Sequence, residues 1–343
     1  MALSREATRA LQEARVGDPF SILGLHHEGE TLCARIWQQE ATRVQLRDRA
    51  DGTTWELQRS APGLFEAPLP HRQDAFAYEL LVDDVHGAQE RLVRDPYSFW
   101  LQLSEWDLDR FREGRHHHIG GVLGAVPATV DQARGVRFAV WAPTAERVSV
   151  IGDWNGFDGR WHPMRLRHPY GVWELFIPGV VSGAKYKYEI RGRDGSLRVK
   201  ADPYARQAEL PPATASIVSR GDAFAWGDQD WMERRGEADW RCRPLAIYEI
   251  HIGSWQRAEG DRQLGYREMA HRLIEHCRHC GFTHVEFLPL AAHPYEGSWG
   301  YQVTSHYAPN ARHGEPDDLR YLIDRLHGAG IGVLVDFVPG HFP

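Results

Sequence analysis

The last hundred residues alternate apolar runs with helical stripes, and this alternation restricts the fold more than any other feature of the sequence. Short apolar runs at 246–252, 283–288 and 331–335 are predicted to be strands. Between them, apolar residues recur at three- and four-residue spacing over 266–277 and 319–326, which predicts two amphipathic helices. Crossovers of this length indicate a parallel sheet, because antiparallel neighbours need only tight turns.

Polar and aromatic residues follow each predicted strand. His251 and Trp255 close the first strand, a long loop over 289–314 follows the second, and Asp336 and His341 follow the third. In parallel α/β folds, functional groups gather past the carboxyl ends of the strands. An unpaired carboxylate is costly to bury among apolar side chains, so Asp336 is predicted to lie at a strand mouth and to face a polar cleft.

This region contains the segments YEIHIGSW at 248–255, HPYEGSWGYQ at 293–302 and VDFVPGHFP at 335–343. Together they resemble the start of the catalytic barrel of glycoside hydrolase family 13, the α-amylase superfamily. Their sequences are most similar to those of bacterial 1,4-α-glucan (glycogen) branching enzymes, and the resemblance extends over essentially the whole chain. DFVPGH stands where the superfamily has its first signature region, with Gly340 in place of Asn, as is usual in branching enzymes.

The resemblance implies substrate-binding roles for three residues. Tyr301 would stack beneath the sugar at the cleavage point, His341 would bond the hydroxyls of that sugar, and Asp336 would hold the polar network of the site in place. The implied partner is an α-glucan such as glycogen or amylose.

The catalytic carboxylates are expected outside the sequence. A retaining mechanism needs two carboxylates about 5 to 5.5 Å apart. In this family they follow the fourth and fifth barrel strands, whereas the sequence ends at Pro343, straight after the third predicted strand. We therefore assign no catalytic residue within the chain and expect the nucleophilic Asp and the acid/base Glu beyond Pro343. Residues 1–343 alone are predicted to be inactive in branching.

The upstream half of the chain contains an internal repeat. The matching segments are ARIWQQEATRV at 34–44 with FAVWAPTAERV at 138–148, FAYEL at 76–80 with YKYEI at 186–190, and Asp-Pro-Tyr at 95–97 with Asp-Pro-Tyr at 202–204. Such self-similarity indicates two copies of one module. Within each copy, short alternating segments are separated by Gly, Pro and Asp turns, which is typical of an antiparallel β-sandwich.

The predicted fold is therefore multidomain, with two β-sandwich (immunoglobulin-like) modules followed by the first part of a (β/α)8 TIM barrel, truncated after the third strand. The predicted domains are an amino-terminal sandwich at 1–115, a second sandwich at 116–225 and the incomplete barrel at 226–343. The second module resembles a carbohydrate-binding module of family 48. The first resembles the extra amino-terminal module that many branching enzymes carry.

The second module offers a candidate glucan-binding surface at Trp154, Phe157 and Lys187. The resemblance implies that an aromatic residue at the position of Phe157, the Lys at the position of Lys187 and a second aromatic residue hold a glucan chain. Leu197 stands where that second aromatic residue would be, so the stacking surface is reduced. Weak glucan binding and a purely structural role both stay open.

Composition limits the classes of binding partner and the cellular compartment that we expect for the protein. A net charge of -7 and a pI near 6.2 give no reason to expect nucleic acid or an anionic membrane as partner. No apolar run approaches the roughly 18 residues of a membrane span, and the amino terminus lacks the apolar core of a signal peptide. Four Cys without a secretory signal suggest free thiols in the cytoplasm. We expect the full-length form to be monomeric.

No metal or other cofactor is predicted. Cys277 and Cys280 form half of a zinc motif, and no second half with suitable spacing follows. Both cysteines lie on or next to the apolar stripe of a predicted helix, where packing explains them.

Three functions compete at this level. The first is a branching enzyme, which cleaves an α-1,4-glucan and transfers the oligosaccharide to a 6-hydroxyl by a retaining double displacement. The second is a debranching enzyme or a trehalose-releasing hydrolase of the same superfamily. The third is a glucan-binding or scaffold fragment. The joint occurrence of HIGSW, HPYEGSWGYQ and VPGHFP favours the first over the second.

Overall fold

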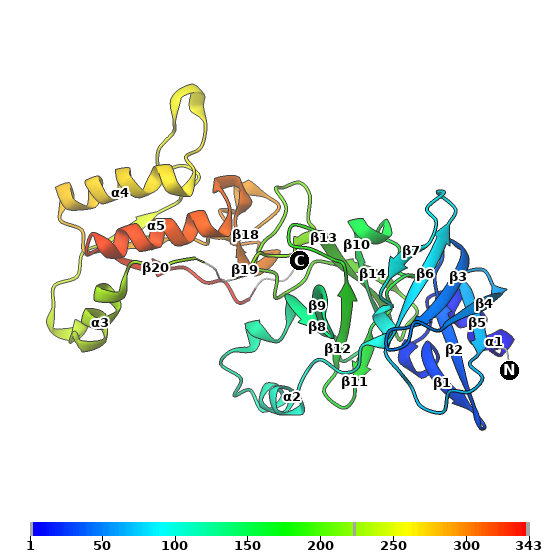
Figure 1. Cartoon of the computed structure of the whole chain (residues 1–343). Coiled ribbons are helices and arrows are strands. Elements are labelled where there is room, and N and C mark those ends of the chain that lie inside the picture. The colour runs from blue at the N-terminus through cyan, green and yellow to red at the C-terminus, as the bar shows by residue number, and fades with distance from the viewer. Residues whose placement is uncertain (1–2, 222–223, 341–343) are drawn as a thin grey trace. The chain divides into compact units, whose positions relative to one another are not determined.

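The computed structural model describes residues 3–221 and 224–340 (Figure 1). The chain divides into two compact units, Met1–Asp202 and Pro203–Pro343. The first unit is built almost entirely from antiparallel strands, whereas the second combines helices with a parallel sheet. The predicted β-rich, multidomain architecture is confirmed at this level, and the domain limits and the full barrel stay predictions.

The first sandwich of the amino-terminal unit contains one helix and seven strands. Their bounds are α1 (Arg5–Gln12), β1 (Gly24–Glu28), β2 (Thr31–Trp37), β3 (Ala41–Asp48), β4 (Thr54–Ala61), β5 (Leu64–Pro68), β6 (Tyr78–Asp84) and β7 (Arg91–Val93). The strands pair antiparallel in the order β1-β2-β5-β4-β3-β6-β7. Side chains from both ends of this order, including Ile36 of β2 and Leu80 of β6, share one buried core, so the sheet is folded over itself.

The second sandwich follows a short helix. The bounds are α2 (Glu105–Arg112), β8 (Gly124–Val130), β9 (Ala133–Trp141), β10 (Ala145–Gly152), β11 (Arg165–Arg167), β12 (Val172–Pro178), β13 (Lys185–Gly192) and β14 (Leu197–Lys200). One sheet has the order β11-β12-β9-β8, and the other contains β10-β13-β14. The two sheets face each other, since the ring of Phe138 on β9 lies 5.2 Å from that of Tyr186 on β13.

The internal repeat makes the same contact in both copies. The hydroxyl of Tyr78 donates to Oδ2 of Asp95 at 2.5 Å, and the hydroxyl of Tyr186 donates to Oδ2 of Asp202 at 2.6 Å. All four residues are buried. A buried carboxylate needs a hydrogen-bond partner, and each copy supplies a tyrosine from the second strand before its Asp-Pro-Tyr segment.

The carboxyl-terminal unit holds the predicted parallel sheet. The bounds are β15 (Ser216–Ile217), α3 (Gln229–Glu237), β16 (Ile247–Ile250), α4 (Tyr266–Cys280), β17 (His284–Phe287), β18 (Ala291–Ala292), β19 (Ser305–Pro309), α5 (Pro316–Gly328) and β20 (Gly332–Val335). Strands β16, β17 and β20 pair parallel in that order. The three predicted strands and two predicted helices are therefore confirmed.

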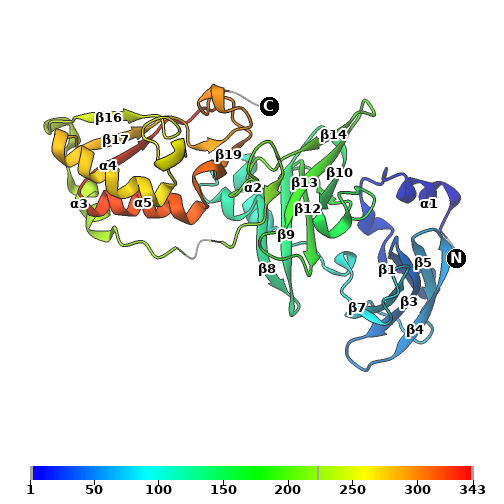
Figure 2. The same cartoon turned by 90° about the horizontal axis from the view of Figure 1, so that it is seen from above.

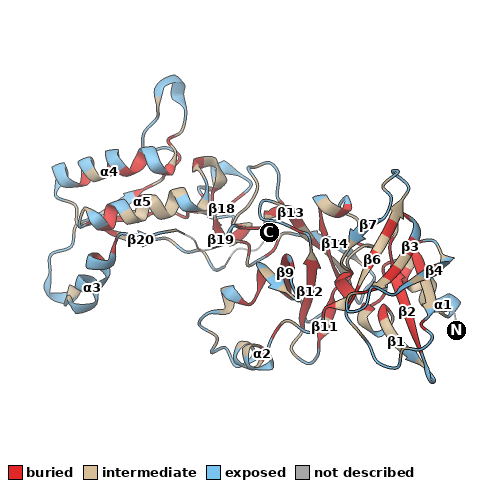
Figure 3. Ribbon diagram, viewed as in Figure 1, coloured by how far each residue is buried: buried red, intermediate tan, exposed pale blue. Residues whose placement is uncertain are grey.

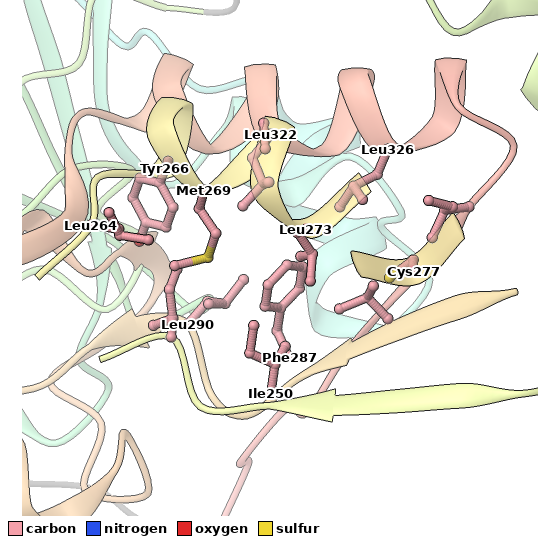
Figure 4. Close-up of a cluster of buried hydrophobic side chains, with 14 residues drawn as sticks. Ile250, Leu264, Tyr266, Met269, Leu273, Cys277, Phe287, Leu290, Leu322 and Leu326 are labelled. Carbon is pink, nitrogen blue, oxygen red and sulfur yellow. The ribbon is translucent and has the colours of Figure 1, made fainter. Parts of the chain in front are cut away.

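Helices α4 and α5 cover one face of this sheet (Figure 2). The stripe of α4 enters the core beside Ile250, Phe287 and Leu322 (Figure 4), and its outer face is exposed (Figure 3). Gly281 ends α4 at φ 79°, a left-handed conformation that glycine adopts without steric cost.

Two further features of this unit differ from the simple alternation. The predicted loop at 289–314 contains a short antiparallel hairpin, in which β18 pairs with β19. Helix α3 packs against α5, because the ring of Trp231 stacks on that of His327 at 5.1 Å, and Asp228 lies 2.7 Å from Nδ1 of the same histidine. Within 3–221 and 224–340, none of the helices has both the length and the apolar character that crossing a bilayer requires.

Candidate functional site

The carboxyl ends of the three parallel strands lie side by side. The amide of Leu288, directly after β17, donates to the carbonyl of Ile250 at 3.0 Å, and the amide of Asp336, directly after β20, donates to the carbonyl of Phe287 at 2.9 Å. The residues that follow the strands therefore share one edge of the sheet. This is the edge at which functional groups gather in parallel α/β folds.

Tyr301 and Asp336 meet at this edge. The Tyr301 hydroxyl donates to Oδ2 of Asp336 at 2.7 Å, although 35 residues separate them in the sequence. This hydrogen bond raises the pKa of Tyr301 above its ordinary value, so the phenol stays protonated and remains the donor. The side chain is still 39% exposed, which leaves part of its ring accessible. His341, the third predicted substrate-binding residue, lies outside the described residues.

The backbone of the loop fixes the position of Tyr301. Gly300 has φ +91°, and a Cβ there would lie 2.4 Å from the carbonyl oxygen of Pro289. Only glycine fits both that conformation and that close approach. The amide of Tyr301 then donates to the carbonyl of Ser298 at 3.0 Å. Trp299, between them, has φ +55°, a region that bulky residues rarely occupy outside strained, often functional, segments.

Trp299 and His251 stack beside this loop. Their rings lie 5.4 Å apart at 28°, and the indole is 56% exposed. Nδ1 of His251 lies 2.7 Å from the Ser254 hydroxyl, and partial burial lowers the pKa of this histidine, so the ring is neutral at physiological pH. Trp255 takes no part in this stack, because its indole donates to the Tyr248 hydroxyl at 3.0 Å and packs on the core.

Two carboxylates of this region were missed in the sequence. Glu249 of β16 and Glu286 of β17 are register partners in the sheet, and both contribute to the raised pKa of Tyr301. The period-two alternation of the strands could have revealed them. Ile250 and Phe287 enter the core, so the residue before each of them faces the opposite side of the sheet.

The three predicted residues of the second sandwich occupy unequal positions. Phe157 is 40% exposed, and Lys187 on β13 is partly exposed. The Trp154 ring instead packs against Phe138 at 5.6 Å, and its indole nitrogen is buried. Leu197, at the start of β14, is exposed. The accessible part of this surface is therefore Phe157 with Lys187.

The described residues place no group of three or more His, Cys, Asp or Glu side chains where it could hold a metal ion. Cys277 is buried in the core of the carboxyl-terminal unit, whereas Cys280 is exposed, and both are free thiols.

Two family models match the chain. The N-terminal domain of the alpha-1,4-glucan branching enzyme GlgB matches residues 4–97. Carbohydrate-binding module 48, the isoamylase N-terminal domain, matches residues 122–205.

Curated relatives match the chain over nearly its whole length. The 1,4-alpha-glucan branching enzyme GlgB of Rhodospirillum rubrum is 49% identical, and the alignment covers 98% of the chain and 46% of that relative. The 1,4-alpha-glucan branching enzyme GlgB 2 of Rhizobium etli is 46% identical, and the alignment covers 99% of the chain and 46% of that relative. The chain thus spans about half the length of the curated relatives it matches. A crystal structure described as that of a "Putative alpha Amylase from Salmonella typhimurium" aligns with 64% of the chain and 33% of that protein, at 27% identity and a TM-score of 0.49.

Proposed function

We propose that this chain, which belongs to the family of 1,4-α-glucan branching enzymes, contributes two parts of the complete enzyme. Its carboxyl-terminal unit forms one wall of a glucan-cleaving site, and its amino-terminal unit supplies the modules that precede that site. The complete enzyme would cleave an α-1,4-glucan, hold the oligosaccharide as a covalent intermediate and transfer it to a 6-hydroxyl. The observation that carries this proposal is the hydrogen bond between Tyr301 and Asp336 at the carboxyl edge of the parallel sheet.

Tyr301 would act as the platform for the sugar ring at the cleavage point. Its hydroxyl is engaged by Asp336, so the phenol cannot swing away, while the exposed part of its ring remains available for stacking. Asp336 would position Tyr301 and the neighbouring polar groups. His341 would bond the hydroxyls of the same sugar. None of the three takes the role of nucleophile or proton donor.

The chemistry of double displacement requires two further carboxylates. One attacks the anomeric carbon and the other protonates the leaving oxygen, which calls for a separation of about 5 to 5.5 Å. We propose that later barrel strands supply both and that residues 1–343 alone form no branches. Incubation of the purified chain with amylose, followed by iodine staining and a reducing-end assay, tests this directly, and branch formation by a homogeneous preparation would refute it.

The role of Tyr301 can be tested in a chimera. Residues 1–343 are joined to the part of the Rhodospirillum rubrum relative that follows its aligned region. Tyr301→Phe keeps the ring and removes the hydroxyl bonded to Asp336, so we expect branching to fall by about 10-fold, the loss of one hydrogen bond to a charged group. Tyr307→Phe is the matched control, because Tyr307 is an exposed tyrosine on β19.

The products of the chimera separate the alternatives. A fall in iodine absorbance without new reducing ends indicates transfer, whereas released reducing sugar indicates a hydrolase. Equal activity of Tyr301→Phe and Tyr307→Phe would contradict the proposed role of the Tyr301 hydroxyl.

The second sandwich supports an additional glucan-binding role, because the module that matches it is named for carbohydrate binding. We propose weak binding through Phe157 and Lys187, with Trp154 supporting the surface from inside. Retardation of the whole chain in a native gel containing glycogen measures this binding. Phe157→Ala should abolish the part due to this surface, whereas Leu210→Ala, at another exposed apolar residue, should not. Equal retardation of both variants would dispose of the idea.

A further inference from the structure

A cleft opens between the two sandwiches of the amino-terminal unit. Its volume is about 680 Å³, within the range of small-molecule sites. Hydrogen bonds between the sandwiches fix its walls. The Trp37 indole donates to the carbonyl of Arg160 at 2.8 Å, and the Tyr97 hydroxyl donates to the carbonyl of Pro163 at 3.3 Å. Phe99 and Phe176 also pack together, at 4.8 Å.

Two residues that line this cleft carry N–H donors without a protein acceptor. Nε1 of Trp154 and Nε of Arg94 are both buried and have no hydrogen-bond partner among the residues that the structure describes. A buried donor left unpaired costs about 1 to 3 kcal/mol. An oxygen-rich molecule in the cleft would remove that cost at two places.

His162 adds a third donor, and its tautomer follows from its neighbours. Asn155 accepts from the amide of Gly152 at 2.8 Å through Oδ1, and Nδ2 donates to the carbonyl of Val150 at 3.1 Å. The same Nδ2 lies 2.8 Å from Nδ1 of His162, which must accept, so Nε2 carries the hydrogen. Burial lowers the pKa of His162 to about 3, so the ring stays neutral.

The charges and aromatic rings of the residues that line the cleft indicate the chemical class of its ligand. Its charged residues are Glu40, Asp158, Arg91 and Arg94, so the formal charges cancel and an anionic ligand gains no net attraction. Trp161 contributes a partly exposed indole that stacks on His162 at 6.4 Å and 25°. Paired donors and acceptors beside a flat aromatic ring suit a neutral molecule with many hydroxyls.

We infer that this cleft binds a neutral oligosaccharide, with the Trp161 ring beneath a sugar and the N–H groups of Trp154, His162 and Arg94 directed at its oxygens. The identity of the sugar as an α-glucan segment rests on the proposed function. Neither Phe157 nor Tyr301 lines the cleft, although Trp154, which also supports the Phe157 surface from inside, does.

The Trp154 indole N–H provides a direct probe in the whole chain. In a ¹⁵N-labelled protein, its resonance is assigned by comparison with Trp154→Phe, and maltotriose is then titrated. We expect a saturable downfield shift as the unpaired donor gains an acceptor. No shift up to the solubility limit of maltotriose, or a larger shift with inorganic phosphate, would overturn the inference.

Variants locate the ligand within the cleft. Trp161→Ala should weaken maltotriose binding by about 3- to 10-fold, the worth of one aromatic stacking contact. Trp161→Phe keeps a ring and should lose less. Trp106→Ala, at an exposed tryptophan of α2 that does not line the cleft, should leave the affinity unchanged. Unchanged affinity of Trp161→Ala would place the sugar elsewhere.

The test of the cleft can fail or succeed independently of the test of the proposed function. The cleft is measured by binding to residues 1–343, whereas the role of Tyr301 is measured by branching in the chimera. If the cleft binds maltotriose and the chimera forms no branches, the proposed activity fails and the carbohydrate site stands. If the chimera branches and the Trp154 resonance does not respond, only the cleft proposal fails.

Discussion

Asp95 should make the stability of the amino-terminal unit depend on pH. Burial raises the pKa of Asp95 to about 6, and the ordinary value of 3.8 applies in the unfolded chain. The folded state therefore binds the proton more tightly, and this stabilisation is complete below about pH 3.8 and lost as the pH rises through 6. When the pH is lowered from 7 to 4, the free energy of unfolding of the wild type should increase by about 2 kcal/mol relative to that of Asp95→Asn. Urea unfolding at both pH values measures this gain.

A second carboxylate of the first sandwich, Asp51, provides a control of opposite sign. Hydrogen bonds from Thr53 and Arg72 lower the pKa of Asp51 to about 2. Its contribution to stability is present above the unfolded pKa and is lost as the pH falls through 2. The wild type should therefore keep its stability relative to Asp51→Asn between pH 7 and pH 4, where it gains stability relative to Asp95→Asn, and lose it only as the pH falls from about 3.8 toward 2. The same direction for both residues would contradict the assignment of Asp95.

At the level of residues, the sequence predicts the place of a polar side chain better than that of a tryptophan. Asp336 was expected at a strand mouth because burying a carboxylate is costly, and its hydrogen bond to Tyr301 follows from two strand ends at one edge. Trp154 and Trp255 instead turn their rings toward the core. An indole suits both a core and a sugar platform, so local sequence does not decide between them.

The pairing of β10 with β13 includes a buried ion pair whose loss should destabilise the second sandwich. Arg147 is 1% exposed and donates to Oε1 of Glu189 at 2.7 Å and to the hydroxyl of Ser149 at 2.5 Å. Arg147→Met leaves the Glu189 carboxylate without this partner, and we expect a loss of about 3 kcal/mol in the free energy of unfolding. Adding Glu189→Gln should recover part of it, because the residual charge is removed.

An exposed ion pair of the first sandwich serves as the control for the buried pair. Arg43 of β3 bonds Glu56 of β4 at 2.8 Å in contact with solvent. Arg43→Met should lower the free energy of unfolding far less than Arg147→Met does, since surface ion pairs contribute little. If urea titration gives the same loss for Arg147→Met and Arg43→Met, the buried pair does not stabilise the pairing of β10 with β13.

At the level of elements, periodicity located the strands and helices of the carboxyl-terminal unit but not the hairpin within its long loop. Helices α4 and α5 carry apolar stripes over several turns, which gives a clear pattern. Strand β18 has two residues and β19 has five, and the intervening segment contains glycine, proline and aromatic residues. Such short strands show no alternation, and their pairing depends on tertiary contacts that local sequence does not encode.

For the molecule as a whole, the sheet of the carboxyl-terminal unit should bind a hydrophobic dye. Helices α4 and α5 cover one face, whereas Ile247, Leu334 and Phe337 are exposed. Exposed apolar groups of this kind bind 8-anilinonaphthalene-1-sulfonate. We expect dye fluorescence in native buffer, and we expect Leu334→Lys to reduce it. The new ammonium group would lie beside Glu286, the register partner of Leu334, so the substitution should be tolerated.

The control for dye binding lies in the other compact unit. Val181 is more exposed than Leu334, at 67% against 39%, but it lies in the turn between β12 and β13, outside this sheet. If the uncovered sheet is the binding surface, Val181→Lys leaves the fluorescence unchanged while Leu334→Lys lowers it. Equal reductions in fluorescence by the two variants would mean that the dye binds to exposed apolar residues scattered over the surface. Far-UV circular dichroism of each variant confirms that its secondary structure is retained, so a lower signal reports the lost apolar surface.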